Sequence, residues 1–238
     1  AAFNEHEEAR YIIECIKQWV DEGNRLEEAA ILYRSNAQSR VLESAMLRAE
    51  IPYRIYGGQR FYERMEIKNA LSYLRLISNS DDDIAFERVV NLPSRGIGER
   101  TQSAIRQIAR RQGCSLWSAS SQAIANNELS SRASNALAMF LELINAITHE
   151  VKELPLIEKT ETMIKQSGLM DFYKRERGER GMARVENLEE LVSACGNFEP
   201  EEANLAPLTQ FLDQVALDAG DRQANIDEDA VQLMTLHS

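Results

Sequence analysis

The stretch AAILYRSNAQSRVLESAMLRAEIPYRIYGG, residues 29–58, decides the fold class. Residues 29–33 form a short apolar run that predicts a buried strand, and residues 53–56 predict a second strand, which two glycines end. Residues 39–49 lie between them and carry apolar side chains on one helical face, a pattern that residues 66–78 repeat. The order strand, helix, strand, helix predicts an α/β unit with a parallel sheet.

The remainder of the chain predicts a protein that is mostly helical overall. After Asp81-Asp82-Asp83, which we interpret as a solvated cap or turn, apolar residues recur only at helical spacing. Helices are expected at about 5–21, 132–151, 155–166, 185–195 and 205–217. An acidic loop over 218–229 then leads into a last predicted strand over 230–238.

These patterns predict a fold of the class α/β plus all-α. The simplest organisation is an all-helical domain inserted into an α/β domain, with the last strand rejoining the first sheet. A parallel sheet is buried on both faces and needs covering helices. Because few such helices are available here, we expect the chain to be part of a longer protein.

The charge of the chain is unevenly distributed. The net charge is −11 over 238 residues, which taken alone argues against a nucleic-acid partner. Two basic segments nevertheless stand out: residues 94–111 hold five arginines against one glutamate, and residues 174–184 hold five cations against two glutamates. Residues 199–230 are strongly acidic. The acidity is therefore concentrated, and two local basic segments remain within an acidic chain.

Membrane and secreted classes are not supported by the sequence. No apolar run approaches the roughly 18 residues that a membrane span needs, and the first residues do not resemble a signal peptide. The three cysteines, Cys15, Cys114 and Cys195, form neither a metal-ligand pair nor a disulfide framework. We interpret them as structural thiols buried in helices, and we expect a cytoplasmic protein with no membrane partner.

Polar residues follow two of the predicted strands. Arg34 and Asn36 come directly after the first strand, and open parallel sheets bind ligands at that edge. The alternative is an arginine salt bridge and an asparagine helix cap. Thr235 and His237 end the last strand, where the histidine could contact a ligand or serve a structural role.

The segment LPSRGIGERT, residues 92–101, precedes an amphipathic helix and predicts a phosphate site. Its glycines allow a tight turn, so that backbone N–H groups at the helix N-terminus face outward toward an anion. The alternative is an ordinary glycine-rich connection with solvated arginines. Ser130-Ser131-Arg132 could be a second hairpin of this kind, although a plain helix N-cap fits it better.

No catalytic machinery is visible in the sequence. It contains no phosphate-binding P-loop, no dinucleotide fingerprint, no nucleophile elbow and no motif of metal ligands. We therefore expect no catalytic residue and no metal site within this chain.

Several segments, in this order, closely resemble the superfamily 1A DNA helicases of the UvrD/Rep/PcrA type, and most of all their UvrD branch. The resemblance covers essentially the whole chain. It rests on AILYRSNAQSR (30–40), IPYRIYGG (51–58), RFYERMEIKN (60–69), the Gly-Ile-Gly segment, ENLEEL (186–191) and VQLMTLHS (231–238). One departure is Asn69, where the family more often has aspartate.

The resemblance implies part of an ATP-driven 3′-to-5′ DNA translocase. Two RecA-like motor domains, 1A and 2A, clamp ATP and Mg between them, and a helical domain, 2B, is inserted in 2A. Residues 1–91 and 229–238 would be a partial 2A, and residues 92–228 would be 2B, with hinges near 90–93 and 225–229. The Walker motifs lie outside this chain, which alone should bind no cofactor and hydrolyse no ATP.

The resemblance also implies partners and site residues. The partners are single-stranded and 3′-tailed duplex DNA and, for the whole protein, repair proteins and RNA polymerase. Arg34, Asn36, Thr235 and His237 would line the single-strand track; Gly96, Ile97, Gly98, Arg100, Thr101 and, by a looser match, Arg132 would contact duplex DNA. A different class of function is also open, namely a non-catalytic helical module that docks repair partners.

Overall fold

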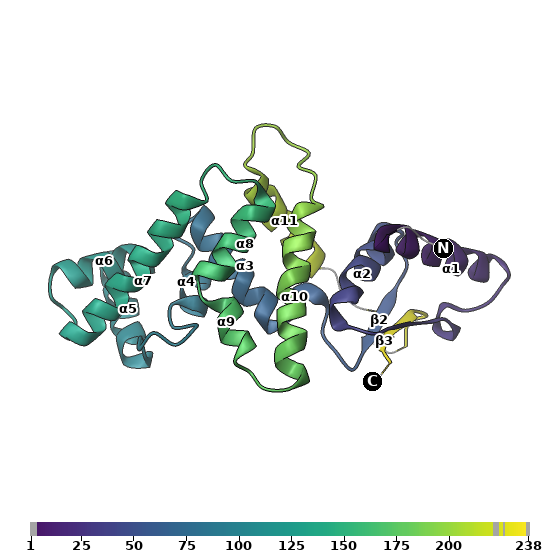
Figure 1. The fold of residues 1–238 in the computed structure, drawn as a ribbon, viewed down its shortest axis with the longest axis horizontal. Helices are drawn as coiled ribbons and strands as arrows, with labels where there is room; N and C mark the ends of the chain where they lie inside the picture. Colours follow the sequence, from purple (N-terminus) through teal and green to yellow (C-terminus); the bar gives the residue numbers. More distant parts are fainter. Residues whose placement is uncertain (1–3, 221–223, 226, 237–238) are drawn as a thin grey trace. The chain divides into compact units, whose positions relative to one another are not determined.

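The computed structural model describes residues 4–220, 224–225 and 227–236 (Figure 1). The chain divides into two compact units, unit 1 with residues 1–67 and 213–238, and unit 2 with residues 68–212. It passes between them within helix α3 (Met65–Ser78) and again within helix α11 (Pro207–Gly220). These boundaries differ from the expected insertion at 92–228. They describe packing rather than the domains of a helicase family, so that division stays a prediction.

Unit 1 is the α/β part of the chain. Its three strands are all parallel and lie in the order β1-β3-β2. Besides its parts of α3 and α11, its remaining elements within the described residues are two α-helices and three short 3-10 turns. In chain order they are α1 (Glu5–Asp21), η1 (Leu26–Glu28), β1 (Ala30–Tyr33), η2 (Asn36–Gln38), α2 (Ser39–Arg48), β2 (Tyr53–Tyr56), η3 (Phe61–Glu63) and β3 (Val231–Thr235).

The last strand is the central strand of the sheet. β3 pairs with β1 in a register that sets Tyr33 opposite Thr235, and with β2 in a register that sets Tyr53 opposite Val231. The expectation that the final strand rejoins the first sheet is therefore confirmed. This topology brings the carboxyl ends of β1 and β3 side by side.

One face of this sheet carries the core of unit 1. Alternate strand residues, among them Tyr33, Ile55 and Leu233, pack with apolar residues of α1 and α2. The residues between them belong to the opposite face, where Leu32 is 57% exposed and Tyr56 is 39% exposed. Only one face of the sheet is therefore fully covered within the described residues, as expected for a sheet with few helices.

Arg54 holds the segment that leads into β3. Its guanidinium donates to the carbonyl oxygens of Ala224 (3.3 Å), Asn225 and Glu228 (3.3 Å). The N–H of Glu27 also donates to Asp229 Oδ1, at 2.8 Å. The expected hinge at 225–229 lies in this segment, and its motion stays a prediction.

Unit 2 is entirely helical within the described residues. Its helices, besides its parts of α3 and α11, are α4 (Asp83–Val89), α5 (Glu99–Gln112), α6 (Leu116–Ala125), α7 (Ser131–Glu150), α8 (Leu156–Gln166), α9 (Leu169–Lys174) and α10 (Glu179–Gly196). α5 packs on α6 and α6 on α7, whereas α10 packs on α8 and α9 (Figure 1). Over the described parts of the chain, the helices are too short or too polar to cross a membrane.

The structure corrects several details of the predicted helices. α4, α6 and α9 were not expected as separate helices, and α10 begins at Glu179 rather than near residue 185. Asp82 caps α4 by accepting from the N–H of Ala85 at 2.9 Å. Asp83 is more than a solvated turn residue, since its Oδ1 accepts from the N–H of Leu116 at 2.7 Å and caps α6.

The three thiols do not share one environment. Cys195 is buried, as expected, but Cys15 is exposed on α1, and Cys114 is half-buried in the turn between α5 and α6. The interpretation of all three as buried helical thiols is therefore wrong for two of them.

Asn69 occupies a buried polar junction in unit 2. Its Nδ2 donates to the Tyr173 hydroxyl at 2.8 Å, and its Oδ1 accepts from Arg88 Nη1 at 3.2 Å. An amide can make both contacts because it carries a donor and an acceptor. Both polar atoms of the Asn69 side chain are therefore hydrogen-bonded, at a position where the family that this sequence resembles more often has aspartate.

Candidate nucleic-acid interface

The first group of site residues lies at the carboxyl edge of the sheet. Arg34 and Asn36 directly follow β1, and Thr235 ends the neighbouring strand β3. The N–H of Leu236 donates to the Tyr33 carbonyl at 3.0 Å, which continues the pairing to this edge. Three of the four predicted single-strand residues therefore come together, and the fourth, His237, lies outside the described residues.

Asn36 is not the helix cap that the alternative reading required. Ser35 is the N-cap of the 3-10 turn η2, since its Oγ accepts from the N–H of Ala37 at 3.3 Å, and Gln38 stands at the N-cap position of α2. The Asn36 carbonyl instead accepts from Arg64 Nη1 at 2.7 Å. Its side-chain Oδ1 lies 3.9 Å from where a Cβ on Gly58 would stand. The amide of Asn36 therefore lies beside the turn that follows β2.

Arg34, two residues before Asn36, is exposed. Its backbone N–H donates to Gln38 Oε1 at 3.0 Å, as does that of Ser35 at 3.1 Å. Within the described part of the chain, the Arg34 guanidinium forms no ion pair. The salt-bridge alternative thus has no partner there, and the cation is free to meet a phosphate.

A buried polar network supports this edge. Arg64 Nη2 donates to Ser39 Oγ at 2.6 Å, and Ser39 Oγ donates to Glu43 Oε1 at 2.6 Å. The N–H of Phe61 donates to both oxygens of Glu43, at 3.2 and 3.1 Å. Arg64 and Glu43 are both buried. The network ties the Asn36 loop to α2 and η3.

Burial dominates the electrostatics of this network. It raises the pKa of Glu43, and the hydrogen bonds from Ser39 and Phe61 and the charge of Arg64 oppose that rise. Burial likewise lowers the pKa of Arg64, against the charge of Glu43. Each charge is therefore costly alone and is stabilised by the other. The sequence alone does not reveal this pair, because the two residues stand far apart in the chain.

The Gly-Ile-Gly segment is fixed by Asn91. The N–H groups of Arg95 and Ile97 donate to Asn91 Oδ1 at 2.8 and 3.1 Å. Gly96 has φ +80, a left-handed conformation that favours glycine. The side chain of Ile97 is fully buried, so Ile97 anchors the segment instead of facing solvent.

Gly98 is the N-cap of α5 and leaves the helix end open. It offers no side-chain cap, and a Cβ built on it would meet nothing within 4 Å. The first N–H groups of a helix have no partner within the helix, and Gly98 and Arg100 are exposed here, with Thr101 half-buried. This arrangement suits an anion at the helix N-terminus.

The arginines of this basic segment have three different roles. Arg95 is internal: it donates to the carbonyls of Val89 (3.3 Å), Pro93 (3.1 Å) and Ser167 (2.9 Å), and its guanidinium stands over an aromatic ring, that of Phe140, at 5.4 Å. Arg111 pairs with Glu128 at 3.0 Å. Only part of the local positive charge is therefore available to a ligand.

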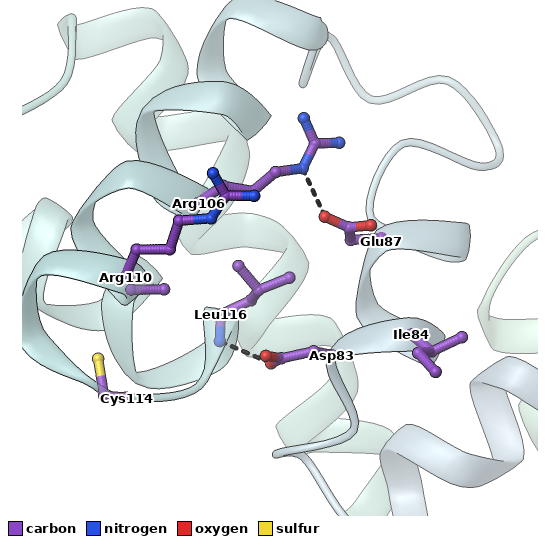
Figure 2. A pocket seen from close by; sticks show the side chains of 8 residues that line it. Asp83, Ile84, Glu87, Arg106, Arg110, Cys114 and Leu116 are labelled. Carbon is purple, nitrogen blue, oxygen red and sulfur yellow. Dashed lines mark hydrogen bonds and ion pairs between the residues drawn. The ribbon is translucent and has the colours of Figure 1, made fainter.

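Arg106 is neutralised at the cavity between α4 and α5 (Figure 2). It pairs with Glu87 and, at 2.6 Å, with Glu99, and these hydrogen bonds raise the pKa of Arg106. Figure 2 shows its side chain directed at Glu87 on the cavity wall, with Arg110 nearby. Arg100 and Arg110 are left as the arginines of this segment with no ion pair among the described residues.

Arg132 is exposed as the second residue of α7. Ser130 is the N-cap of that helix, its Oγ accepting from the N–H of Ala133 at 3.4 Å, so the plain-cap reading is confirmed. Among the described residues, no hydrogen bond or ion pair joins Arg132 to the Gly-Ile-Gly segment. Its role in duplex binding stays a prediction.

No group of three histidine, cysteine, aspartate or glutamate side chains could hold a metal ion in the parts of the chain that the structure describes.

The comparisons with known proteins identify the class. The model of the UvrD-like helicase C-terminal domain matches residues 1–238, so the chain belongs to that family. It is 55% identical over 239 residues to DNA helicase II of Escherichia coli (strain K12), covering 100% of this chain and 33% of that protein.

Other relatives of this chain are DNA helicases as well. Identity is 50% over 240 residues to DNA helicase II of Haemophilus influenzae, covering 100% of this chain and 33% of the relative. It is 39% over 242 residues to ATP-dependent DNA helicase PcrA of Bacillus subtilis (strain 168), covering 99% of this chain and 32% of that relative. The chain thus spans about a third of the length of the curated relatives that it matches. The family resemblance and the fold class expected from the sequence are both confirmed.

Proposed function

We propose that this chain is the 2A/2B part of an ATP-dependent DNA helicase that moves 3′ to 5′ and acts in DNA repair in the cytoplasm. The observation that carries the proposal is the carboxyl edge of the sheet, where Arg34 and Asn36 follow β1 and Thr235 ends β3, in a chain that belongs to a helicase family. Ligands bind parallel sheets at this edge. Arg34 would meet a phosphate of the single strand, and Asn36 a sugar or base edge.

Duplex DNA ahead of the fork would meet the open end of α5. Gly96 and Gly98 let the phosphate backbone approach closely, while Arg100 and Thr101 stand in the first turn of the helix. Ile97 and Asn91 would hold the segment in place. Such contacts position the duplex without reading its sequence.

ATP and Mg belong to the whole protein in this proposal. The sequence of this chain contains no P-loop, the motif that would cradle the phosphates of ATP and place a hydroxyl on Mg. We therefore assign no nucleotide chemistry to this chain. Repair proteins and RNA polymerase are proposed partners of the whole protein.

The proposal is tested by unwinding assays on the whole protein that contains this chain. We expect rapid, ATP-dependent unwinding of a 3′-tailed duplex, and little unwinding of a 5′-tailed or a blunt duplex of the same sequence. The chain alone should hydrolyse no ATP, with or without DNA. Preference for the 5′ tail, or hydrolysis by the chain alone, would refute the assignment.

A further inference from the structure

The turn between α9 and α10 carries a cluster of exposed cations. The "basic turn" consists of Lys174, Arg175, Arg177 and Arg180, all of them exposed. Within the described residues none of the four forms an ion pair. These four charges are therefore available to a partner.

The fifth cation of the segment has an internal role. Arg184 is buried, pairs with Glu176 and stands over the ring of Tyr173 at 5.3 Å. This pairing also occupies Glu176, the acid nearest the middle of the turn. Asp171 and Glu179 remain as exposed acids, so the basic turn keeps a positive excess in a chain of net charge −11.

The helix dipoles favour a positive charge at only two of these four positions. Lys174 and Arg175 stand at the C-terminal end of α9, where a positive charge is favourable to the helix dipole. Arg177 lies in the turn, and Arg180 is the second residue of α10, where the dipole disfavours a cation. The helix dipoles therefore do not stabilise the charges of Arg177 and Arg180, whereas a bound polyanion would.

The basic turn repeats the local sequence of the proposed duplex contact. Gly-Glu-Arg occurs at residues 98–100 and again at 178–180. In both places the glycine is the N-cap of a long helix without a side-chain cap, and the arginine is the second helical residue. α5 and the turn before α10 lie in different parts of the helical unit (Figure 1). The basic turn is therefore a separate surface.

We propose that the basic turn binds the phosphate backbone of duplex DNA as a second contact of the helical unit. Arginine suits this partner, because its planar guanidinium can donate two hydrogen bonds to one phosphate. The charge complementarity is with a polyanion, and the contact carries no sequence preference. The inference rests on the proposed function, since it assumes that this unit meets duplex DNA.

The test compares two variants that each remove four positive charges. In the turn variant Lys174, Arg175, Arg177 and Arg180 are changed to glutamine. In the control variant the changed residues are exposed cations elsewhere, namely Arg10, Lys17, Lys152 and Lys165. All eight side chains are exposed, so both variants should fold, and circular dichroism checks this. Binding to a short blunt duplex is measured by fluorescence anisotropy over a range of salt.

We expect the turn variant to bind the duplex at least about tenfold more weakly than the control variant at about 50 mM salt. The slope of its log affinity against log salt should be shallower by about 3. Equal affinity and slope in the two variants would overturn the inference. So would a turn variant that loses affinity for a polyglutamate probe but not for the duplex, since the surface would then fit an acidic polypeptide.

A third variant, Gly98→Asp, separates this inference from the proposed function. If Gly98→Asp weakens duplex binding and the turn variant matches its control, the second contact is wrong and the first stands. If the unsubstituted chain binds no duplex at all, the proposed duplex contact fails and this inference falls with it.

Discussion

Replacing Arg64 with alanine is expected to lower the free energy of unfolding of unit 1 by about 3–5 kcal/mol. Arg64 is 7% exposed and Glu43 is 5% exposed. Without Arg64 the buried Glu43 carboxylate would lose its ion-pair partner, with Arg60 left as the other cation acting on it, and the Asn36 carbonyl and Ser39 would lose a donor. The loss therefore exceeds that of an exposed arginine.

The chain provides a reporter for this unit. It has two tryptophans, Trp19 in unit 1 and Trp117 in unit 2. In a Trp117→Phe background, the fluorescence of Trp19 during urea unfolding follows unit 1 alone. Arg48→Ala, at an exposed position of α2, is the matched control and should change stability by about 0.5 kcal/mol at most.

A double variant distinguishes the effect of leaving a buried charge unpaired from the effect of losing the packing of the Arg64 side chain. Glu43→Gln with Arg64→Met removes both charges, and it should recover much of the stability that Arg64→Ala loses. A loss below about 1 kcal/mol in Arg64→Ala would show that the pair does not support the sheet edge.

The Gly98→Asp variant is expected to weaken duplex binding by about tenfold to a hundredfold, while the fold stays intact. Gly98 has φ −77 and ψ 175, which any residue adopts, and its Cβ position is open. Aspartate is also a preferred N-cap, so α5 should be as stable as before or more so. Its carboxylate would, however, stand where the phosphate is proposed to bind.

The matched control for this variant is Gly98→Asn. Asparagine caps the helix equally well but carries no charge, so duplex binding should fall much less. Single-strand binding should be unchanged in both variants. If Gly98→Asp and Gly98→Asn bind the duplex as the unsubstituted chain does, the open end of α5 is not a phosphate site. Gly96 is unsuitable for this test, because its φ of +80 would strain any side chain.

Local patterns sufficed for most of the fold. The spacing of apolar residues predicted α1 (Glu5–Asp21) and β2 (Tyr53–Tyr56) with the bounds that the structure has. α6 was missed because its sequence, LWSASSQAIA, is rich in serine, a weak helix former. Its start depends on caps from Ser115 and Asp83, and Asp83 lies on another helix.

The roles of charged residues were harder to predict. Counting charges treated the five arginines of residues 94–111 alike, yet Arg95 reaches the carbonyl of Ser167 and Arg106 reaches Glu87. Such partners are brought together only by helix packing. The sheet edge could be predicted, because residues that follow parallel strands meet at one edge. The buried pair of Glu43 and Arg64 beneath it could not, since single charged residues carry no periodic signal.

The measurement that tests the central claim most directly is the fluorescence anisotropy of the purified chain on a single strand, a blunt duplex and a 3′-tailed duplex. Salt is varied from low to physiological concentration. The account predicts the tightest binding to the 3′-tailed duplex, and log affinity that falls linearly with log salt. No binding to any probe by a chain that circular dichroism shows to be folded would contradict it, and a docking module would then describe this chain better.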